Sequence, residues 1–139
     1  MYLIDTNVVS EMRKMEKANP GVRAFFSGLQ DDQVPLYLSV ITIGELRRGV
    51  EKIRHRGDTG QAERLERWLS QVCAEYADSI LMFDDEMAQV WGRLRVPSHE
   101  NALDKQIAAT ALIYDLTVVT RNVGDFEGTG VRLINPFSG

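Results

Sequence analysis

Four acidic residues of this sequence lie beside apolar segments that are expected to be buried. A carboxylate in such a place is costly unless a cation neutralises it, and a divalent metal ion is the usual partner. Carboxylate oxygens select hard cations, Mg²⁺ or Mn²⁺, rather than zinc. Such ions lower the pKa of bound water and stabilise displacement at phosphorus, so phosphodiester hydrolysis is the expected reaction. The four acids are Asp5, Glu45, Asp104 and Asp125.

Each acid taken alone also has a structural interpretation. Asp5 directly follows an apolar run, where aspartate commonly caps a helix, and the same alternative applies to Asp104. Glu45 has Arg48 three residues later, which is a suitable spacing for an exposed ion pair on a helix. Asp125, in the segment Val-Gly-Asp-Phe, is of a type common in turns. The metal hypothesis therefore depends on whether the four residues converge.

Apolar spacing predicts strands that alternate with helices along the chain. The strand candidates are short and rich in Val, Ile and Leu, which is typical of strands buried on both faces. Alternation of this kind predicts an α/β fold with an open, mostly parallel sheet. Strands are expected at residues 2–4, 36–38, 80–83, 116–119 and 131–134, and helices after Asn7, after Pro20, and at residues 42–56, 61–76, 85–94 and 103–114.

These elements would bring the acids to one edge of the sheet. In open parallel sheets ligands bind outside the carboxyl ends of the strands. Asp5 follows the first strand, while Asn122 and Asp125 follow the fourth. They meet if these two strands are neighbours. Glu45 and Asp104 lie near the starts of two predicted helices, which begin at the same edge.

The segment that follows Glu45 is strongly basic. Residues 47–56 contain five Arg or Lys side chains and His55 against one acid, Glu51. The simplest interpretation is a solvated helix face, and the alternative is a surface that follows a phosphate backbone. Gly44 and Gly49 interrupt the same helix, which predicts a close approach by another backbone or a ligand.

Length and composition indicate an ordinary globular protein. At 139 residues, 44% hydrophobic and 26% charged, the chain is expected to form one domain over residues 1–139. Its net charge of −4 argues against a protein that coats DNA. A single cysteine, Cys73, fits a reducing compartment. No signal peptide or membrane span is visible, so a cytoplasmic protein is expected.

Five segments together resemble the PIN domain, in particular the VapC- and FitB-like ribonuclease toxins of toxin–antitoxin pairs. The first contains L-I-D-T-N, the second I-T-I-G-E-L and the third D-K-Q-I-A-A-T-A. All five occur in the family's order and spacing over nearly the whole chain. They are Leu3–Glu11, Leu38–Val50, Asp104–Ala111, Val118–Phe126 and Asn135–Phe137.

The resemblance implies a PIN-like three-layer sandwich, in which helices flank a mostly parallel five-stranded sheet. It also implies a Mg²⁺- or Mn²⁺-dependent endoribonuclease that leaves 5′-phosphate and 3′-hydroxyl ends. Further implications are a homodimer and a cognate antitoxin whose C-terminal segment lies across the active-site groove. By this likeness Asp5, Glu45 and Asp104 match the family's three acidic metal ligands, and Asn7 matches the polar residue that supports the first acid.

The fourth ligand position departs from the pattern of some relatives. Some relatives carry an acid at the position of Asn122, and others carry it three residues later, at the position of Asp125. We assign Asp125 as the fourth ligand and Asn122 as an indirect contact, and the number of metal ions stays open. Thr6 and Thr120 are expected to position ligands or phosphate. The residues expected to contact RNA or the antitoxin are Arg47, Arg48 and Arg54.

Two other functions remain open at this level. One is a phosphatase with Asp5 as its nucleophile, although such enzymes usually carry a second acid two residues later, where this chain has Asn7. The other is a non-catalytic PIN-like module that binds RNA or protein because its fourth ligand position is incomplete.

Overall fold

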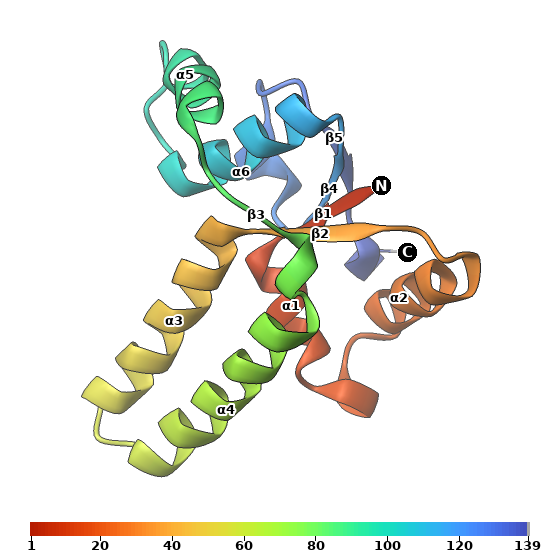
Figure 1. The fold of residues 1–139 in the computed structure, drawn as a ribbon, viewed down its shortest axis with the longest axis vertical. Coiled ribbons are helices and arrows are strands. Elements are labelled where there is room, and N and C mark those ends of the chain that lie inside the picture. The colour runs from red at the N-terminus through yellow and green to blue at the C-terminus, as the bar shows by residue number, and fades with distance from the viewer. Residues whose placement is uncertain (139) are drawn as a thin grey trace.

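The computed structural model describes residues 1–138 and contains one sheet of five parallel strands in the order β3-β2-β1-β4-β5 (Figure 1). Six helices surround this sheet. The predicted α/β fold with a parallel sheet is therefore confirmed. The strands are β1 (Tyr2–Ile4), β2 (Leu36–Ser39), β3 (Ile80–Leu81), β4 (Thr117–Val119) and β5 (Arg132–Ile134), and the helices are α1 (Thr6–Met12), α2 (Pro20–Asp32), α3 (Val40–His55), α4 (Thr59–Glu75), α5 (Asp85–Leu94) and α6 (Ala102–Tyr114).

The central strand β1 pairs with both β2 and β4. Leu3 lies opposite Tyr37 of β2 and Val118 of β4. This meets the condition set by the sequence, because the carboxyl ends of the first and fourth strands are neighbours. The segments that follow β1 and β4 consequently lie next to each other, where an open α/β sheet binds its ligands.

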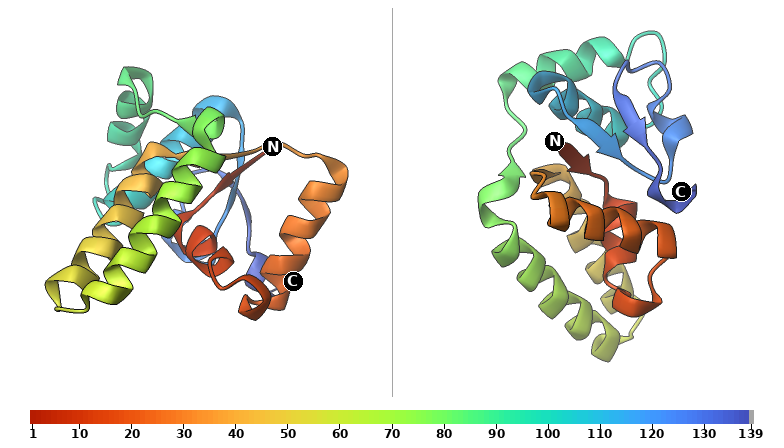
Figure 2. Two further views of the ribbon diagram at one scale, coloured as in Figure 1. Left: turned by 60° about the horizontal axis from the view of Figure 1, so that its bottom comes forward. Right: turned by 90° about the vertical axis from the view of Figure 1, so that its right-hand side faces the viewer.

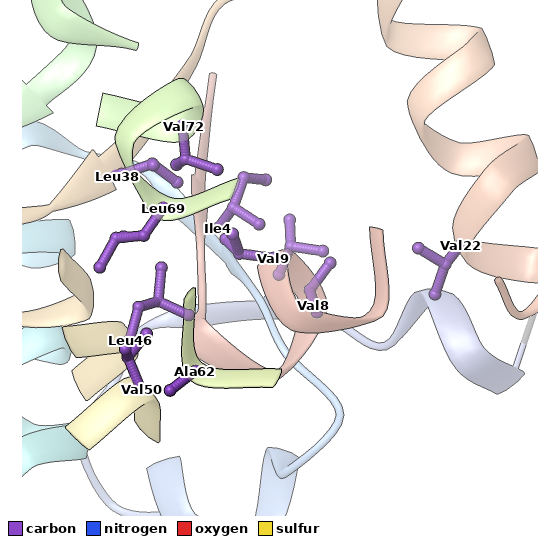
Figure 3. Packing of buried hydrophobic residues seen from close by; sticks show 11 residues of the cluster. Ile4, Val8, Val9, Val22, Leu38, Leu46, Val50, Ala62, Leu69 and Val72 are labelled. Atoms are coloured by element: carbon purple, nitrogen blue, oxygen red, sulfur yellow. The ribbon is translucent and has the colours of Figure 1, made fainter. Parts of the chain in front are cut away.

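Alternate strand residues contribute to two separate hydrophobic cores. Ile4 and Val119 belong to the core that α1, α3 and α4 cover, shown in Figure 3. Leu3 and Val118 belong to the second core, which is closed by α6 and Phe126. Figure 1 shows α5 and α6 on one side of the sheet and the α3–α4 pair on the other. Each face of the sheet is thus buried, which explains why its strands are continuously apolar.

Helices α3 and α4 run side by side as a hairpin that extends away from the sheet (Figures 1 and 2). The turn between them falls within residues 56–60, as the glycines of that segment predict. Helix α3 begins at Val40, two residues earlier than predicted, because the Ser39 hydroxyl accepts a hydrogen bond from the Ile41 backbone N–H at 3.0 Å. This cap satisfies one of the free N–H groups at the helix start.

Two expectations from the sequence are wrong in detail. Strand β3 has two residues instead of four. Gly44 and Gly49 were expected at a close approach by another backbone or a ligand, and the backbone alternative is wrong, because a Cβ atom built on either would meet nothing within 4 Å outside its own stretch of helix. Both lie on the exposed side of α3. The space over Gly44 is therefore open rather than filled by backbone.

Cys73 is half-buried and packs against the first core as a free thiol.

In the part of the chain that the structure describes, no helix is both long enough and apolar enough to cross a membrane.

Gly21 is required where the end of the chain packs on α2. A Cβ atom at this position would lie 2.2 Å from the carbonyl oxygen of Pro136. Gly21→Ala should therefore lower the free energy of unfolding by about 2 kcal/mol, as overpacking against backbone typically does. Urea denaturation followed by circular dichroism measures this effect.

The matched control is Gly28→Ala in the same helix. Gly28 is exposed and a Cβ there would meet nothing within 4 Å, so alanine should stabilise the helix by about 0.5–1 kcal/mol. Equal effects of the two substitutions would contradict the close contact between Gly21 and Pro136.

Candidate active site

Asp5 lies at the carboxyl end of β1 and is only 2% exposed. Its backbone N–H continues the pairing of β1 with β4 by donating to the Val119 carbonyl at 2.9 Å. One carboxylate oxygen, Oδ1, accepts a hydrogen bond from the Thr6 backbone N–H at 2.8 Å, so Asp5 also caps α1. Burial raises the pKa of Asp5 even though its hydrogen bonds act in the opposite direction. The capping role and the buried acid thus coexist in one residue.

The second oxygen of Asp5, Oδ2, is held by two side chains. The Thr120 hydroxyl donates to it at 2.8 Å and the Asn7 amide at 3.1 Å. The side-chain oxygen of Asn7, Oδ1, accepts a hydrogen bond from the Arg121 backbone N–H at 2.9 Å. The Thr120 hydroxyl accepts one from the Asn122 backbone N–H at 3.0 Å. Asn7 and Thr120 therefore fix the Asp5 carboxylate and join α1 to the turn after β4.

Glu45 projects from α3 toward the same region. Its Oε1 accepts from the Thr6 hydroxyl at 2.7 Å, and that hydroxyl lies 3.2 Å from the Thr42 hydroxyl. Burial raises the pKa of Glu45, and the negative charge of Asp5 adds to the effect. Within residues 1–138 Glu45 forms no ion pair with Arg48. The ion-pair alternative for Glu45 is therefore wrong.

Asp104 and Asp125 complete the group. Burial raises the pKa of Asp104 to about 7, and the charges of Asp5, Asp125 and Glu45 add to the shift. Asp125, in the 3₁₀ helix at residues 123–126, also raises the pKa of Asp5. The N-cap position of α6 is Asn101, so Asp104 is not its capping residue. Each acid interacts electrostatically with at least one other, and we call these four residues the acid cluster.

Asn122 and Asp125 have different surroundings. The Asn122 carbonyl accepts from the Asp125 backbone N–H at 3.0 Å, while its side chain is exposed and forms no hydrogen bond with the described residues. Asp125 is half-buried and close enough to shift the pKa values of two other acids. Asp125 thus contributes charge to the acid cluster, and Asn122 contributes backbone groups that shape the turn.

The three arginines expected to contact RNA or the antitoxin do not share one environment. Arg47 pairs with Glu66 at 2.6 Å and with Glu51 at 3.1 Å. Arg54 pairs with the same two acids. Arg48 forms no ion pair among the described residues. Two of the three positive charges therefore join α3 to α4, and Arg48 is the one of the three that is not engaged in this way.

Two buried polar residues near the acids were not predicted. Thr42, fully buried, lies three residues before Glu45, a spacing that places both on one side of α3. Lys105, only 6% exposed, follows Asp104, and its Nζ donates to the Ser98 carbonyl at 2.7 Å. This contact holds the loop that precedes α6. Lys105 could have been noticed in the sequence, because it is a charged residue at the start of a largely apolar helical segment.

The donor groups fit a hard divalent cation. All four acids provide oxygen atoms, and the groups around them are hydroxyls and an amide, a set that suits Mg²⁺ or Mn²⁺ rather than zinc. Among residues 1–138, no three His, Cys, Asp or Glu side chains lie close enough to bind one ion together. Mg²⁺ keeps several waters and binds through one or two carboxylates. An ion bound here would therefore have at most two of these side chains as direct ligands, with water completing its coordination.

Removal of one charge from the acid cluster should stabilise the metal-free protein. The pKa of Asp104 is about 7 in the folded chain, against 3.8 for a free aspartate. The folded state thus binds this proton more tightly, and stability falls as the pH rises from about 4 to about 7. Asp104→Asn should raise the melting temperature at pH 8 by about 3–6 °C, the effect of roughly 1 kcal/mol in a domain of this size. Differential scanning calorimetry in EDTA measures it.

The difference in melting temperature between Asp104→Asn and the parent should shrink as the pH is lowered toward 4, where the parent is protonated at Asp104. Asp115→Asn is the control, because Asp115 is highly exposed and pairs with Arg132. If Asp104→Asn and the parent melt at the same temperature at pH 8, the acids do not repel one another as described.

Comparisons with known proteins show which family the chain belongs to. The sequence matches the PIN domain family over residues 2–129. Toxin FitB from Neisseria gonorrhoeae is 36% identical over 143 residues, which cover 99% of each chain. The VapC ribonuclease Y4jK from Sinorhizobium fredii is 32% identical over 99% of this chain and 98% of its own.

Solved structures show the same fold. The crystal structure of FitAcB from Neisseria gonorrhoeae has a TM-score of 0.76 at 35% identity and covers 99% of both chains. VapBC-5 from Mycobacterium tuberculosis, a member of the VapBC family of toxin–antitoxin systems, has a TM-score of 0.58 at 27% identity, covering 72% of this chain and 81% of its own. The resemblance seen in the sequence motifs is thus confirmed, and the chain belongs to the PIN-domain family.

Proposed function

We propose that this chain is a metal-dependent endoribonuclease that acts as the toxin of a toxin–antitoxin pair. The observation that carries the proposal is the gathering of four carboxylates from separate elements, with the pKa of Asp104 raised to about 7. Such a group of like charges destabilises the fold, and perturbed acids of this kind are typical of functional sites. The names of the relatives, a toxin and a ribonuclease, support the same conclusion.

The residues proposed to hold the cation are those of the acid cluster. Mg²⁺ or Mn²⁺, when bound, would lower the pKa of a water molecule and stabilise charge developing at a phosphodiester. Asp5 is only 2% exposed, so its carboxylate would face the cation in surroundings with little bulk water. The acids also provide carboxylate oxygens that can accept a proton released from water, and a cluster member that does not contact the cation would serve this role.

Hydroxyl and amide groups are proposed to hold the carboxylates in orientation. The Thr120 hydroxyl and the Asn7 amide both donate to Oδ2 of Asp5, and the Thr6 hydroxyl donates to Glu45. Each of these bonds leaves further oxygen lone pairs of the carboxylate available. Removal of a contact that orients a metal ligand in this way commonly lowers metal affinity by about 10–100-fold.

The partners proposed are an RNA substrate, a cognate antitoxin whose C-terminal segment covers the site, and a second copy of this chain. The antitoxin is supported by the likeness to VapBC-5 of a toxin–antitoxin family. The homodimer rests on the motif resemblance alone.

A phosphatase with Asp5 as nucleophile has less support. The position two residues later is Asn7, and its amide is occupied in fixing Asp5 and the turn after β4. Release of phosphate from a phosphomonoester without cleavage of RNA would favour that function. Binding of RNA without cleavage under any metal condition would favour a non-catalytic module.

Loss of one acid should abolish RNA cleavage. Asp104→Asn and Asp5→Asn should each reduce the initial rate more than about 100-fold, beyond the range typical of contacts outside the ligand set. The assay uses purified protein free of any partner, structured RNAs, and Mg²⁺ or Mn²⁺. Asp31→Asn is the control, because Asp31 is an exposed acid of α2. A parental cleavage rate in either cluster variant would show that the site is assigned incorrectly.

The fourth ligand position can be tested by the same assay at varied metal concentration. Asp125→Asn should raise the Mg²⁺ concentration for half-maximal activity about tenfold, because a charge near Asp5 and Asp104 is lost. Asn122→Ala should raise it less, because Asn122 acts through its backbone. The opposite order would assign the fourth position to Asn122.

A further inference from the structure

Helix α3 carries its basic residues on two different sides. One side faces α4, where Arg47 and Arg54 pair with Glu66 and Glu51. Exposed ion pairs of this kind neutralise the arginine charges and contribute little stability. These two arginines therefore join the α3–α4 hairpin, which Figures 1 and 2 show extending from the sheet.

The other side presents Arg48, Lys52 and Arg56, which we call the basic stripe. The three residues are four positions apart and so follow one another along the helix, about 6 Å from one to the next. All three are exposed, and within residues 1–138 none forms an ion pair. They line a shallow surface hollow together with His55 and with Glu51, whose carboxylate is paired with Arg47 and Arg54. Their charges are available to a ligand.

The basic stripe begins at the acid cluster. Arg48 is three residues after Glu45 and lies near enough for its charge to oppose the rise in the pKa of Glu45. Gly44, one turn before Arg48, leaves the helix surface bare, since no atom lies within 4 Å of a Cβ built there. The basic stripe therefore starts about one turn from Glu45, and no other element packs on the helix surface at Gly44.

We propose that the basic stripe of Arg48, Lys52 and Arg56 binds the phosphate backbone of the RNA strand whose scissile phosphate lies at the acid cluster. This inference rests on the proposed ribonuclease function. The chain has a net charge of −4, and its acid cluster repels a polyanion. A local row of cations next to the acids offsets this repulsion and gives the strand a direction.

The surface chemistry favours RNA over an acidic protein segment. Protein interfaces depend on apolar and aromatic anchors, and the stripe consists of basic side chains beside a bare glycine. Side chains suited to serve as such anchors line a separate cavity of about 250 Å³, whose residues include Met12, Phe26 and Trp68. A single row of charges along a helix matches the repeating phosphates of an extended strand.

The test compares two variants that each lose three positive charges. The first is R48Q/K52Q/R56Q, and the second is K17Q/R23Q/R67Q, whose residues are equally exposed but lie on other surfaces. Binding of a fluorescein-labelled single-stranded RNA of mixed sequence is measured by anisotropy, with Ca²⁺ replacing Mg²⁺, over a series of salt concentrations. Melting curves confirm that both variants are folded.

The stripe variant should bind RNA at least about tenfold more weakly at low salt. Its slope of log Kd against log salt should fall by about 2, because each phosphate contact to a single strand contributes about 0.7. The second variant should keep most of the parental affinity and slope. Equal losses in the two variants would overturn the proposal, because RNA would then respond only to net charge.

Two further measurements separate the possible failures. Poly-L-glutamate is the second probe: a stripe variant that loses affinity for this polymer but not for RNA would assign the surface to an acidic protein segment and overturn the proposal. Hydrolysis of bis(p-nitrophenyl) phosphate by the parent with Mn²⁺ tests the chemistry without a strand to follow. If the parent hydrolyses this diester and the stripe variant binds RNA as the parent does, the stripe assignment fails while the proposed function stands.

Discussion

Repulsion among four carboxylates at one edge of the sheet is the constraint on which the rest of this structure depends. Burial makes each of these charges costly, and like charges that share a partly buried site also repel one another. Both effects are visible in Asp104, whose pKa rises to about 7. The two hydrophobic cores on either side of the sheet supply the stability against which this repulsion acts. The fold therefore holds together a group of like charges that protonation or a bound cation would relieve.

The elements around the acids hold each one in a fixed place. The pairing of β1 with β4 puts Asp5 beside Thr120, and the Asn7 amide locks both to the turn that carries Asp125. The start of α3 is set by its cap at Ser39, which determines where Glu45 projects. Helix α6 packs on the second core and presents Asp104 from its first turn. Each acid thus lies on or directly beside an element that packs against one of the two cores.

Much of this arrangement could be predicted from the sequence because it depends on local pattern. The apolar runs defined the strands, and a parallel sheet sends the residues after β1 and β4 to one edge. Other features depend on tertiary packing and could not be predicted. Arg47 and Arg54 are engaged because α4 brings Glu66 beside them, which residue spacing within α3 does not reveal. Asp104 is not a cap because the preceding loop ends at Asn101 in a left-handed conformation.

The central claim is that the acid cluster binds a divalent cation in competition with protons. Titration of Mn²⁺ into the metal-free protein by calorimetry at pH 6, in two buffers of different ionisation enthalpy, tests it most directly. The claim predicts that Mn²⁺ binding releases a proton at pH 6 and much less at pH 8, because Asp104 is protonated below a pKa of about 7. It also predicts that Mn²⁺ binding is lost in Asp5→Asn. Absence of Mn²⁺ binding in the parent, or equal binding in Asp5→Asn, would contradict it.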